Sequence, residues 1–481
     1  MKKLLVVLLS LGLIVAFSTA ASAVDVKFSG GYYVVGVYDN NPELRKEGGY
    51  SRAAFFQRAR VQTQFVVAEG LSLTTRFDAL EKQWGQSDSR SMVAADVDKT
   101  NSRPYSTIPT TSSTTGLTNT AGKNLQENLE FERGFITFKT ALAQFDVGYQ
   151  IAGKWGTDFG DSECTKPRIK FATQAGPLSF LMLYEKNFEA DSSSVGSNAT
   201  GTTSLYRGKT DLDNDMYAVG AIYSFKGGQA GLLFKYVQNS MQRTLIATPY
   251  TTEVMGFVPY FKATVGPVYL EGEATYIKGK MKYDEGTVGV AGDIDLESWN
   301  AYLKAQVNMG PAYFGGQIGW VMGDGDGTAT KMKNINGFSD AGYDWKPTLI
   351  LNNVDYGTWI PNGKDSGNPY KNDPKGFLLY NVFAGVNPTP KLNVEAAVSF
   401  ASYDKKKYWT NAARTTSAEL VSADIGTEID VTATYKIYDN LSYMVGAGYV
   451  FAGSAWKGTD PANTTLGGDT YMLLNKLTLS F

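Results

Sequence analysis

The sequence predicts an all-β protein that crosses a membrane as one antiparallel, up-and-down barrel of about eighteen strands. Polar and apolar residues alternate in segments of about 9 to 15 residues, the length of a tilted strand that crosses a bilayer. Short and long connections alternate along the chain, as they do between the two ends of a barrel. The composition agrees, because 51 Gly suit turns, 29 Tyr and 25 Phe suit interfacial girdles, and only 19% of residues are charged.

Residues 1–23 have the features of a signal peptide, whose removal would leave residues 24–481 as the barrel domain. Lys2 and Lys3 precede an apolar run at residues 4–17, and small residues at 21–23 form a cleavage site. The apolar run is shorter than the roughly 20 residues that a spanning helix requires, and no later run reaches about 18 residues. A membrane-spanning fold of this chain would therefore have to be a barrel.

The alternation is clearest at residues 52–67. One face of this predicted strand is apolar and carries Phe55, Ala59, Val61, Phe65 and Val67. The opposite face is polar and carries Arg58, Arg60, Gln62 and Gln64. The first face suits lipid and the second suits a water-filled lumen.

Eight short turns are predicted, near residues 68–70, 140–143, 175–177, 226–229, 265–267, 309–311, 387–391 and 438–440. The longer connections are predicted to be extracellular surface loops, at residues 39–51, 85–125, 156–165, 189–214, 240–251, 284–293, 324–375, 404–424 and 453–468. With both termini on the periplasmic turn side, eight turns imply about eighteen strands. The segments at 166–174 and 38–52 are the least regular, so a sixteen-stranded barrel is the alternative.

The composition also excludes several classes of function. The chain has no His, so it lacks the usual general base of a Ser-His-Asp or Cys-His site and the commonest zinc ligand. We therefore expect no enzymatic activity, no cofactor and no metal site. Cys164 is the one cysteine and has no partner for an intramolecular disulfide. A net charge of -2 gives no basis for nucleic-acid binding.

The final segment, GDTYMLLNKLTLSF, places alternate residues on one apolar face: Tyr471, Leu473, Leu477, Leu479 and the terminal Phe481. It resembles the terminal strand of bacterial outer-membrane proteins, in which the last aromatic residue is part of the assembly signal. The resemblance implies that Phe481 has this role and that the barrel-assembly machinery is a partner. It also implies a bacterial outer-membrane location, with outer-membrane lipid and lipopolysaccharide around the barrel.

A second resemblance covers residues 131–161, FERGFITFKTALAQFDVGYQIAGKWGTDFGD. This segment is similar to a hairpin of Gram-negative porins, whose following loop folds inward and narrows the pore, although Tyr149 stands where those porins have Arg. An eighteen-strand count also resembles maltoporin and the alginate exporter. The resemblance implies a channel for passive or weakly selective diffusion of small hydrophilic solutes, and a homotrimer. It also makes residues 156–165 the candidate constriction loop, with Asp158, Asp161 and Glu163 facing Arg58, Arg60 and Arg168.

The charged residues on the predicted lumen face segregate along the chain. The predicted pore-lining basic residues are Arg52, Arg58, Arg60, Arg76, Lys154, Arg168 and Lys170. The predicted pore-lining acidic residues are Asp78, Glu130, Glu132, Asp146, Glu271, Glu273, Glu297, Glu395, Glu428 and Asp430. The first four of these acidic residues are near enough in sequence to pair with the early arginines. Because strands follow one another around a barrel, we expect a basic wall opposite a mainly acidic one, with a field across the pore.

Two alternatives to a diffusion channel remain open from the sequence. One is a substrate-specific barrel that takes up or exports an oligo- or polysaccharide. The other is the sheath of a porin–cytochrome electron conduit, which would need a separate haem protein because this chain has no CxxCH motif.

Overall fold

The computed structural model describes residues 24–42, 44–84, 129–189, 212–244, 249–284, 292–325, 327–328, 330–335, 338, 341–353, 355, 374–409, 416–456 and 466–481. The predicted signal peptide at residues 1–23 and the predicted loop at residues 85–125 lie outside these residues. The other predicted long connections are described at least in part.

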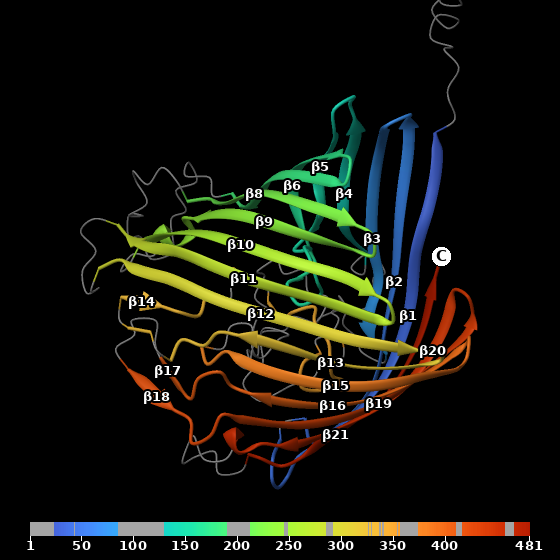
Figure 1. The fold of residues 1–481 in the computed structure, drawn as a ribbon, viewed down its shortest axis with the longest axis vertical. Helices are drawn as coiled ribbons and strands as arrows, with labels where there is room; N and C mark the ends of the chain where they lie inside the picture. The colour runs from blue at the N-terminus through green and yellow to red at the C-terminus, as the bar shows by residue number, and fades with distance from the viewer. Residues whose placement is uncertain are drawn as a thin grey trace, which may run out of the picture.

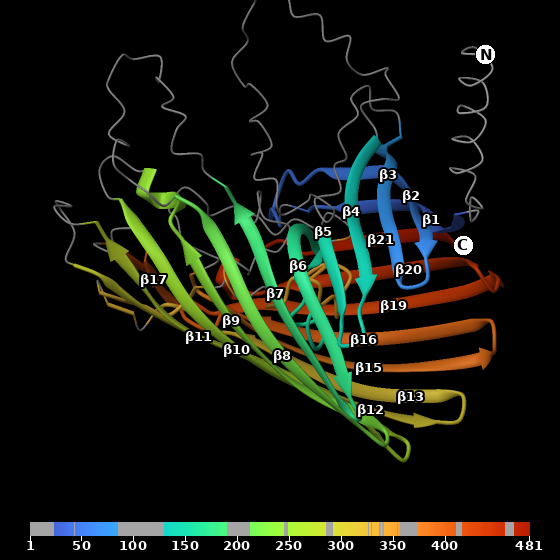
Figure 2. The same ribbon diagram turned by 90° about the horizontal axis from the view of Figure 1, so that it is seen from above.

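Eighteen antiparallel strands follow one another in chain order around a closed barrel (Figures 1 and 2). They are β1 (Asp25–Asn40), β2 (Ser51–Ala68), β3 (Leu71–Gln83), β4 (Leu129–Lys139), β5 (Gln144–Ala152), β6 (Cys164–Ala175), β7 (Leu178–Phe188), β8 (Asn214–Phe225), β9 (Gly228–Asn239), β10 (Tyr250–Val265), β11 (Val268–Tyr283), β12 (Ile294–Met309), β13 (Ala312–Val321), β15 (Phe377–Thr389), β16 (Leu392–Ser402), β19 (Asp424–Tyr438), β20 (Leu441–Ala452) and β21 (Thr470–Ser480). The predicted strand count is confirmed, and the sixteen-stranded alternative is wrong.

The barrel closes where the first strand pairs with the last. Strand β1 pairs with β2 on one side and with β21 on the other. At the end of this seam the amide of Gly30 donates to the carbonyl of Phe481 at 2.8 Å, and the amide of Phe481 donates back at 3.0 Å. The start of β1 and the C-terminus therefore lie at the end of the barrel that carries the short turns, as predicted.

All eight predicted short turns join neighbouring strands. Three of them have a Gly-Pro core, in which Gly176, Gly266 and Gly310 take left-handed φ values of 58°, 60° and 61°. Only glycine adopts this conformation without a steric penalty. The following proline lacks an amide, but its carbonyl still accepts a hydrogen bond from the next strand, as at Pro177, whose partner is the amide of Ser224 at 2.9 Å.

The outer face of the barrel is apolar between two bands of aromatic rings. Near the long loops, four rings lie side by side on β9 to β12, with successive centroids 5.2, 6.5 and 4.2 Å apart. This upper girdle consists of Phe234, Phe257, Tyr276 and Trp299. Near the short turns, Phe138, Phe145 and Phe171 form a lower girdle with centroids 5.0 and 5.5 Å apart. Aromatic girdles around an apolar band are the signature of a barrel that spans a membrane.

The helical segments are short. Among the described residues, two 3-10 helices are complete: η4 (Met241–Thr244) and η7 (Ser454–Trp456). In the described part of the chain, no helix combines the length and the hydropathy needed for a membrane span. The remaining strands lie at the loop end: β14 (Lys331–Met332) pairs in parallel with β12, and β17 (Lys407–Trp409) forms a separate hairpin with β18 (Ser417–Glu419).

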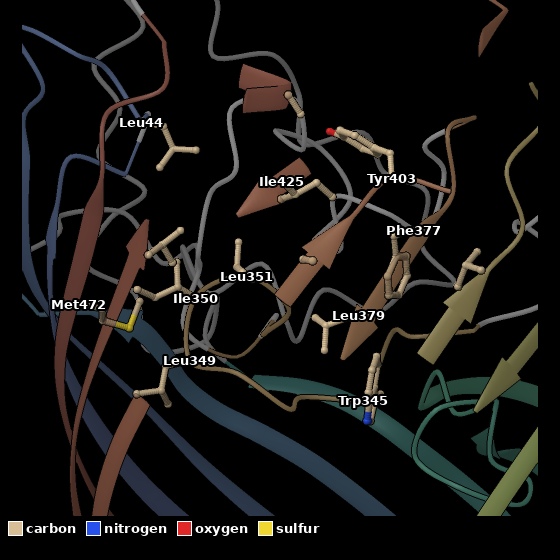
Figure 3. Packing of buried hydrophobic residues seen from close by; sticks show 14 of the residues in the cluster. Leu44, Trp345, Leu349, Ile350, Leu351, Phe377, Leu379, Tyr403, Ile425 and Met472 are labelled. Carbon is tan, nitrogen blue, oxygen red and sulfur yellow. The ribbon is translucent and has the colours of Figure 1, made fainter. Parts of the chain in front are cut away.

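Part of the barrel interior is a hydrophobic core. It includes inward-facing residues of β1, β15 and β21, such as Val35, Leu379 and Met472, and it packs around Leu349 and Leu351 of a long connection (Figure 3). The predicted lumen face is therefore polar only over part of the wall. On the side of the late strands, the chain fills the lumen with its own apolar side chains.

Candidate functional site

In the part of the chain that the structure describes, two segments fold into the barrel from its loop end. The first inward loop, residues 153–163, joins β5 to β6. The amide of Ser162 donates to the carbonyl of Gly153 at 2.7 Å, so the two ends of this loop meet in a narrow neck. The second inward loop, residues 341–353, belongs to the long connection between β13 and β15.

The first inward loop extends into the lumen and binds the part of the wall formed by β10 and β11. The indole of Trp155 donates to the carbonyl of Val258 on β10 at 2.9 Å. The amide and hydroxyl of Thr157 donate to the carboxylate of Glu273 on β11, at 2.6 and 2.8 Å. Gly160 lies so close that a Cβ there would be 1.6 Å from the Glu273 carboxylate, so the loop can approach this wall only with glycine at this position.

The second inward loop is held by a buried carboxylate. Glu428 on β19 is 0% exposed and accepts hydrogen bonds from three consecutive amides. The donors are Leu349 at 3.0 Å, Ile350 at 2.6 Å and Leu351 at 2.6 Å. The sequence predicted residues 324–375 as a surface loop. That prediction is wrong for residues 341–353, because their apolar run is buried only by entering the barrel.

The two inward loops contact each other at the centre. The amide of Gly342 donates to the carbonyl of Phe159 at 2.6 Å. The ring of Phe159 is 0% exposed, stacks on Tyr302 with centroids 5.3 Å apart, and meets the edge of Trp345 at 5.5 Å. The loops therefore form one packed unit rather than two separate flaps.

The wall opposite this unit carries a network of arginines and carboxylates. Arg60 on β2 forms a two-point ion pair with Asp78 on β3, at 2.7 and 2.6 Å, and lies 3.3 Å from Glu132 on β4. Arg58 lies 3.6 Å from Asp78, and Arg76 pairs with Glu132. The early strands therefore contribute paired charges of both signs, not an uncompensated basic wall.

A bulge in β4 adds an arginine that the sequence did not predict. The register shifts between the Arg76–Arg133 pair and the Phe77–Phe131 pair. Glu132 and Arg133 therefore both point inward, and Arg133 bonds a carboxylate of the first inward loop at 2.7 Å. Strict alternation would have placed Arg133 on the lipid face. An arginine in that position was the available signal of a bulge.

A cavity of about 560 Å³ lies between the inward loops and this wall. Its basic lining residues are Arg58, Arg60, Arg76, Lys154, Lys304, Lys346 and Lys476. Its acidic lining residues are Glu132, Asp158, Asp161, Glu163, Glu271, Asp344 and Asp355. Charges of both signs around one space can solvate ions and polar groups and penalise apolar solutes.

Asp161 and Glu163, both on the first inward loop, have opposite pKa shifts. Burial raises the pKa of Asp161 to about 7, although the Trp155 amide, which donates at 2.7 Å, and Lys154 act to lower it. Burial also acts to raise the pKa of Glu163. There Lys154 at 3.2 Å and Arg133 at 2.7 Å outweigh burial and hold the pKa below its ordinary value. Asp161 therefore changes charge near neutral pH.

Three other predicted basic residues lie in ion pairs beyond the cavity lining. Arg168 lies 2.9 Å from Glu185 and not opposite the loop carboxylates, where the sequence placed it. The remaining two pairs are Lys170 with Asp146 at 2.9 Å and Arg52 with Asp39.

The predicted acidic residues of the later strands bind protein groups. The Tyr302 hydroxyl donates to Glu271 at 2.8 Å, and the Tyr313 hydroxyl donates to Glu395 at 2.7 Å. Asp430 accepts from the amide of the second inward loop at Leu349, at 3.3 Å. With Glu273 and Glu428, these residues hold the loops and the wall together. Glu130 faces Asp78 across the β3–β4 pair.

Glu297 lies on the other face of the barrel from the one predicted. It is on the outer face, where it shares a strand face with Trp299 and pairs with Lys331 at 2.6 Å. Its neighbours Ile294 and Leu296 point inward and are buried in a second hydrophobic cluster. Between its loop end and the upper girdle, β12 lies beyond the apolar belt. In this part of the strand the inner face is apolar and buried, and the outer face carries charged side chains.

These features define a class. A closed barrel with an apolar belt, two aromatic girdles and inward loops that narrow a charged lumen has the architecture of an outer-membrane porin. No protein-family model and no curated protein matches the sequence.

Among solved structures, the chain is similar in fold to OccAB1 of Acinetobacter baumannii, with 11% identity, a TM-score of 0.48, and 96% of this chain and 99% of that chain covered. It is also similar to the outer-membrane protein OpdK of Pseudomonas aeruginosa, with 12% identity, a TM-score of 0.43, and 95% and 99% covered. A third similar structure is an anion-selective porin from Comamonas acidovorans, with 10% identity, a TM-score of 0.42, and 95% and 99% covered.

Proposed function

We propose that this protein is a channel through which small hydrophilic solutes and ions diffuse across the bacterial outer membrane. The observation that carries the proposal is the cavity of about 560 Å³ inside the barrel, which is lined by charged side chains of both signs. Such a lining replaces part of the hydration of a polar solute, whereas an apolar solute forms no favourable interaction with it. Diffusion of this kind needs positioned charges and no catalytic group.

The constriction in this proposal is the unit formed by the two inward loops. Asp158, Asp161 and Glu163 line the cavity together with Arg58 and Arg60. In this proposal the loop carboxylates face the two arginines across the passage. The resulting field crosses the passage at this level and orients dipolar solutes. This field is restricted to the level of the inward loops. The predicted field between a basic early wall and an acidic late wall would be weak, because most charges of those walls are paired or buried.

The arrangement supports a channel over a sheath for a separate haem protein. The chain's own inward loops and the hydrophobic core around Leu349 and Leu351 occupy the interior. A folded partner of any size would have to displace them. The homotrimeric state stays a prediction from the sequence.

The test uses the neck of the first inward loop. Since the amide of Ser162 already bonds the carbonyl of Gly153, residues 154–161 can be excised and the two ends joined. We expect the wild-type protein to open ion channels in planar bilayers, and the excised variant to conduct about twofold more or better, because part of the constriction is gone.

Heat-dependent electrophoretic mobility should show that the excised variant still forms a barrel. Gly134→Ala, whose Cβ would meet nothing within 4 Å, is the control variant and should conduct like the wild type. Purified wild-type protein that opens no channel would contradict the proposed function. Unchanged conductance in the folded excised variant would contradict the constriction alone.

A further inference from the structure

Beyond the upper girdle, β11 carries three lysines on its outer face. Lys278, Lys280 and Lys282 follow Tyr276 at every second position, and all three are exposed. Tyr276 itself belongs to the upper girdle, where its ring lies 4.2 Å from that of Trp299. We call the three residues the lysine strip. The strip begins one row above the rings.

The lysine strip is flanked by one exposed carboxylate, Asp295, and one half-buried carboxylate, Glu253. Lys280 lies 3.6 Å from Asp295 on β12, and Lys282 lies 2.6 Å from Glu253 on β10. The lysine side chains in these two pairs are 45% and 47% exposed. Ion pairs with this much solvent contact are weak, so a stronger anion can replace the carboxylate.

Lys331 on β14 adds a fourth ammonium group to the surface, 2.6 Å from Glu297. Lys333 also acts on Glu297, and Asp293 also acts on Lys282. Among the described residues, the surface then has five cations against four carboxylates, namely Glu253, Asp293, Asp295 and Glu297. Its net charge is positive, while the whole chain has a net charge of -2. Positive charge is therefore concentrated on this outer surface.

The position of the lysine strip along β11 sets its depth in a membrane. The strand begins at Val268, directly after a short turn, and Lys278 lies ten residues further on. At ~3.3 Å per residue and a tilt of ~45°, ten residues rise ~23 Å, close to the ~25 Å height of the apolar belt of such barrels. Lys280 and Lys282 then lie at the level of the lipid headgroups, as residues above an aromatic girdle should.

We propose that the lysine strip binds the phosphate groups of the phosphorylated glycolipid of the outer leaflet. The proposal rests on the outer-membrane location given above. The surface is a positively charged, open wall directly above lipid-facing rings, which favours an anionic ligand that lies within the plane of the membrane. A phosphorylated glycolipid meets both requirements, since its acyl chains lie against the apolar belt and its phosphates reach the ammonium groups.

The test compares the response of the barrel to lipid A with and without the lysine strip. The combined variant Lys278→Gln, Lys280→Gln and Lys282→Gln is purified in detergent beside the wild type, and both are mixed with bis-phosphorylated lipid A. The readout is the temperature at which the folded electrophoretic band converts to the unfolded one. A ligand that binds only the folded state raises this temperature, by about 5 °C for the wild type, and the variant should show less than half of the rise.

Two controls isolate the surface and the phosphate. The combined variant Lys139→Gln, Lys391→Gln and Lys436→Gln removes three exposed lysines at the turn end and should respond like the wild type. Dephosphorylated lipid A should stabilise the wild type by less than half as much. An equal response of the lysine-strip variant, or an equal effect of the dephosphorylated lipid, would overturn the proposal.

Conductance in phosphatidylcholine bilayers separates this proposal from the channel proposal. The lysine-strip variant should conduct like the wild type, because the strip lies outside the lumen. A wild type that binds lipid A but does not conduct would contradict only the channel.

Discussion

The carboxylate of Asp78 lies between two guanidinium groups on the inner wall: it forms a two-point ion pair with Arg60, at 2.7 and 2.6 Å, and lies 3.6 Å from Arg58. Asp78 is 1% exposed, so water does little to compensate these charges. Asp78 therefore compensates both guanidinium groups, together with Glu81, which lies 3.3 Å from Arg58, and Glu132, which lies 3.3 Å from Arg60.

Asp78→Asn should shift the channel towards anions. The substitution keeps the shape of the side chain and removes its charge, which leaves Arg58 and Arg60 with less compensation. The reversal potential in a KCl gradient should move in the anion-selective direction. Asp439→Asn, at an exposed turn between β19 and β20, should leave it unchanged. A shift towards cations would contradict the proposed charge balance.

Ion selectivity should depend on pH through Asp161. Its pKa is raised to about 7 by burial, so between about pH 6 and pH 8 the side chain passes from mostly neutral to mostly ionised. Cation preference should increase over this range, and Asp161→Asn should flatten the change. The folded state binds this proton more tightly than the unfolded chain, so ionisation also costs stability as the pH rises from about 4 to above 7. If the selectivity of Asp161→Asn depended on pH in the same way as that of the wild type, another group would be responsible for the pH dependence.

Gly160→Ala should release the first inward loop from its wall. An alanine Cβ would lie 1.6 Å from the Glu273 carboxylate, which is held by Thr157 and cannot simply rotate away. The loop must move towards the lumen axis or detach, and single-channel conductance should change by about a third or more. Gly134→Ala, with nothing within 4 Å, is the matched control and should conduct normally.

Glu428→Ala should free the second inward loop. Three amides, those of Leu349, Ile350 and Leu351, would lose their common acceptor in a buried site, at a cost of about 3 kcal/mol or more. Limited proteolysis of the folded barrel should then cut within residues 341–353 at least tenfold faster. Glu395→Ala removes a carboxylate that accepts from Tyr313 and should not accelerate cleavage there. Equal rates in both variants would show that Glu428 does not hold the loop.

The strand count and the turns could be predicted because they depend on local chemistry. Alternation of side chains needs only the two faces of a strand, and Gly-Pro turns such as Gly266-Pro267 need only the conformations of two residues. The inward position of Arg58 and Arg60 follows from the same alternation. These features do not depend on what fills the lumen.

The remaining features depend on contacts that are remote in sequence. Arg133 points inward only because β4 bulges opposite β3. The pleat of β12 puts Glu297 on the outer face, where a charge is tolerated because this part of the strand lies beyond the apolar belt. The second inward loop is apolar at Leu349, Ile350 and Leu351 within a polar connection. That run was the one signal that this connection would enter the barrel, but the carboxylate that receives it is 77 residues away from Leu351.

The pairing of β1 with β21 determines when the barrel can insert into the membrane. Until β21 is in place, β1 and β20 each present a row of unpaired amides and carbonyls. Hydrocarbon cannot satisfy these groups, and in water such edges are templates for aggregation. Insertion of the first seventeen strands is therefore favourable only together with the last one. A chain truncated before Thr470 should accumulate as aggregate and not as an open sheet in the bilayer.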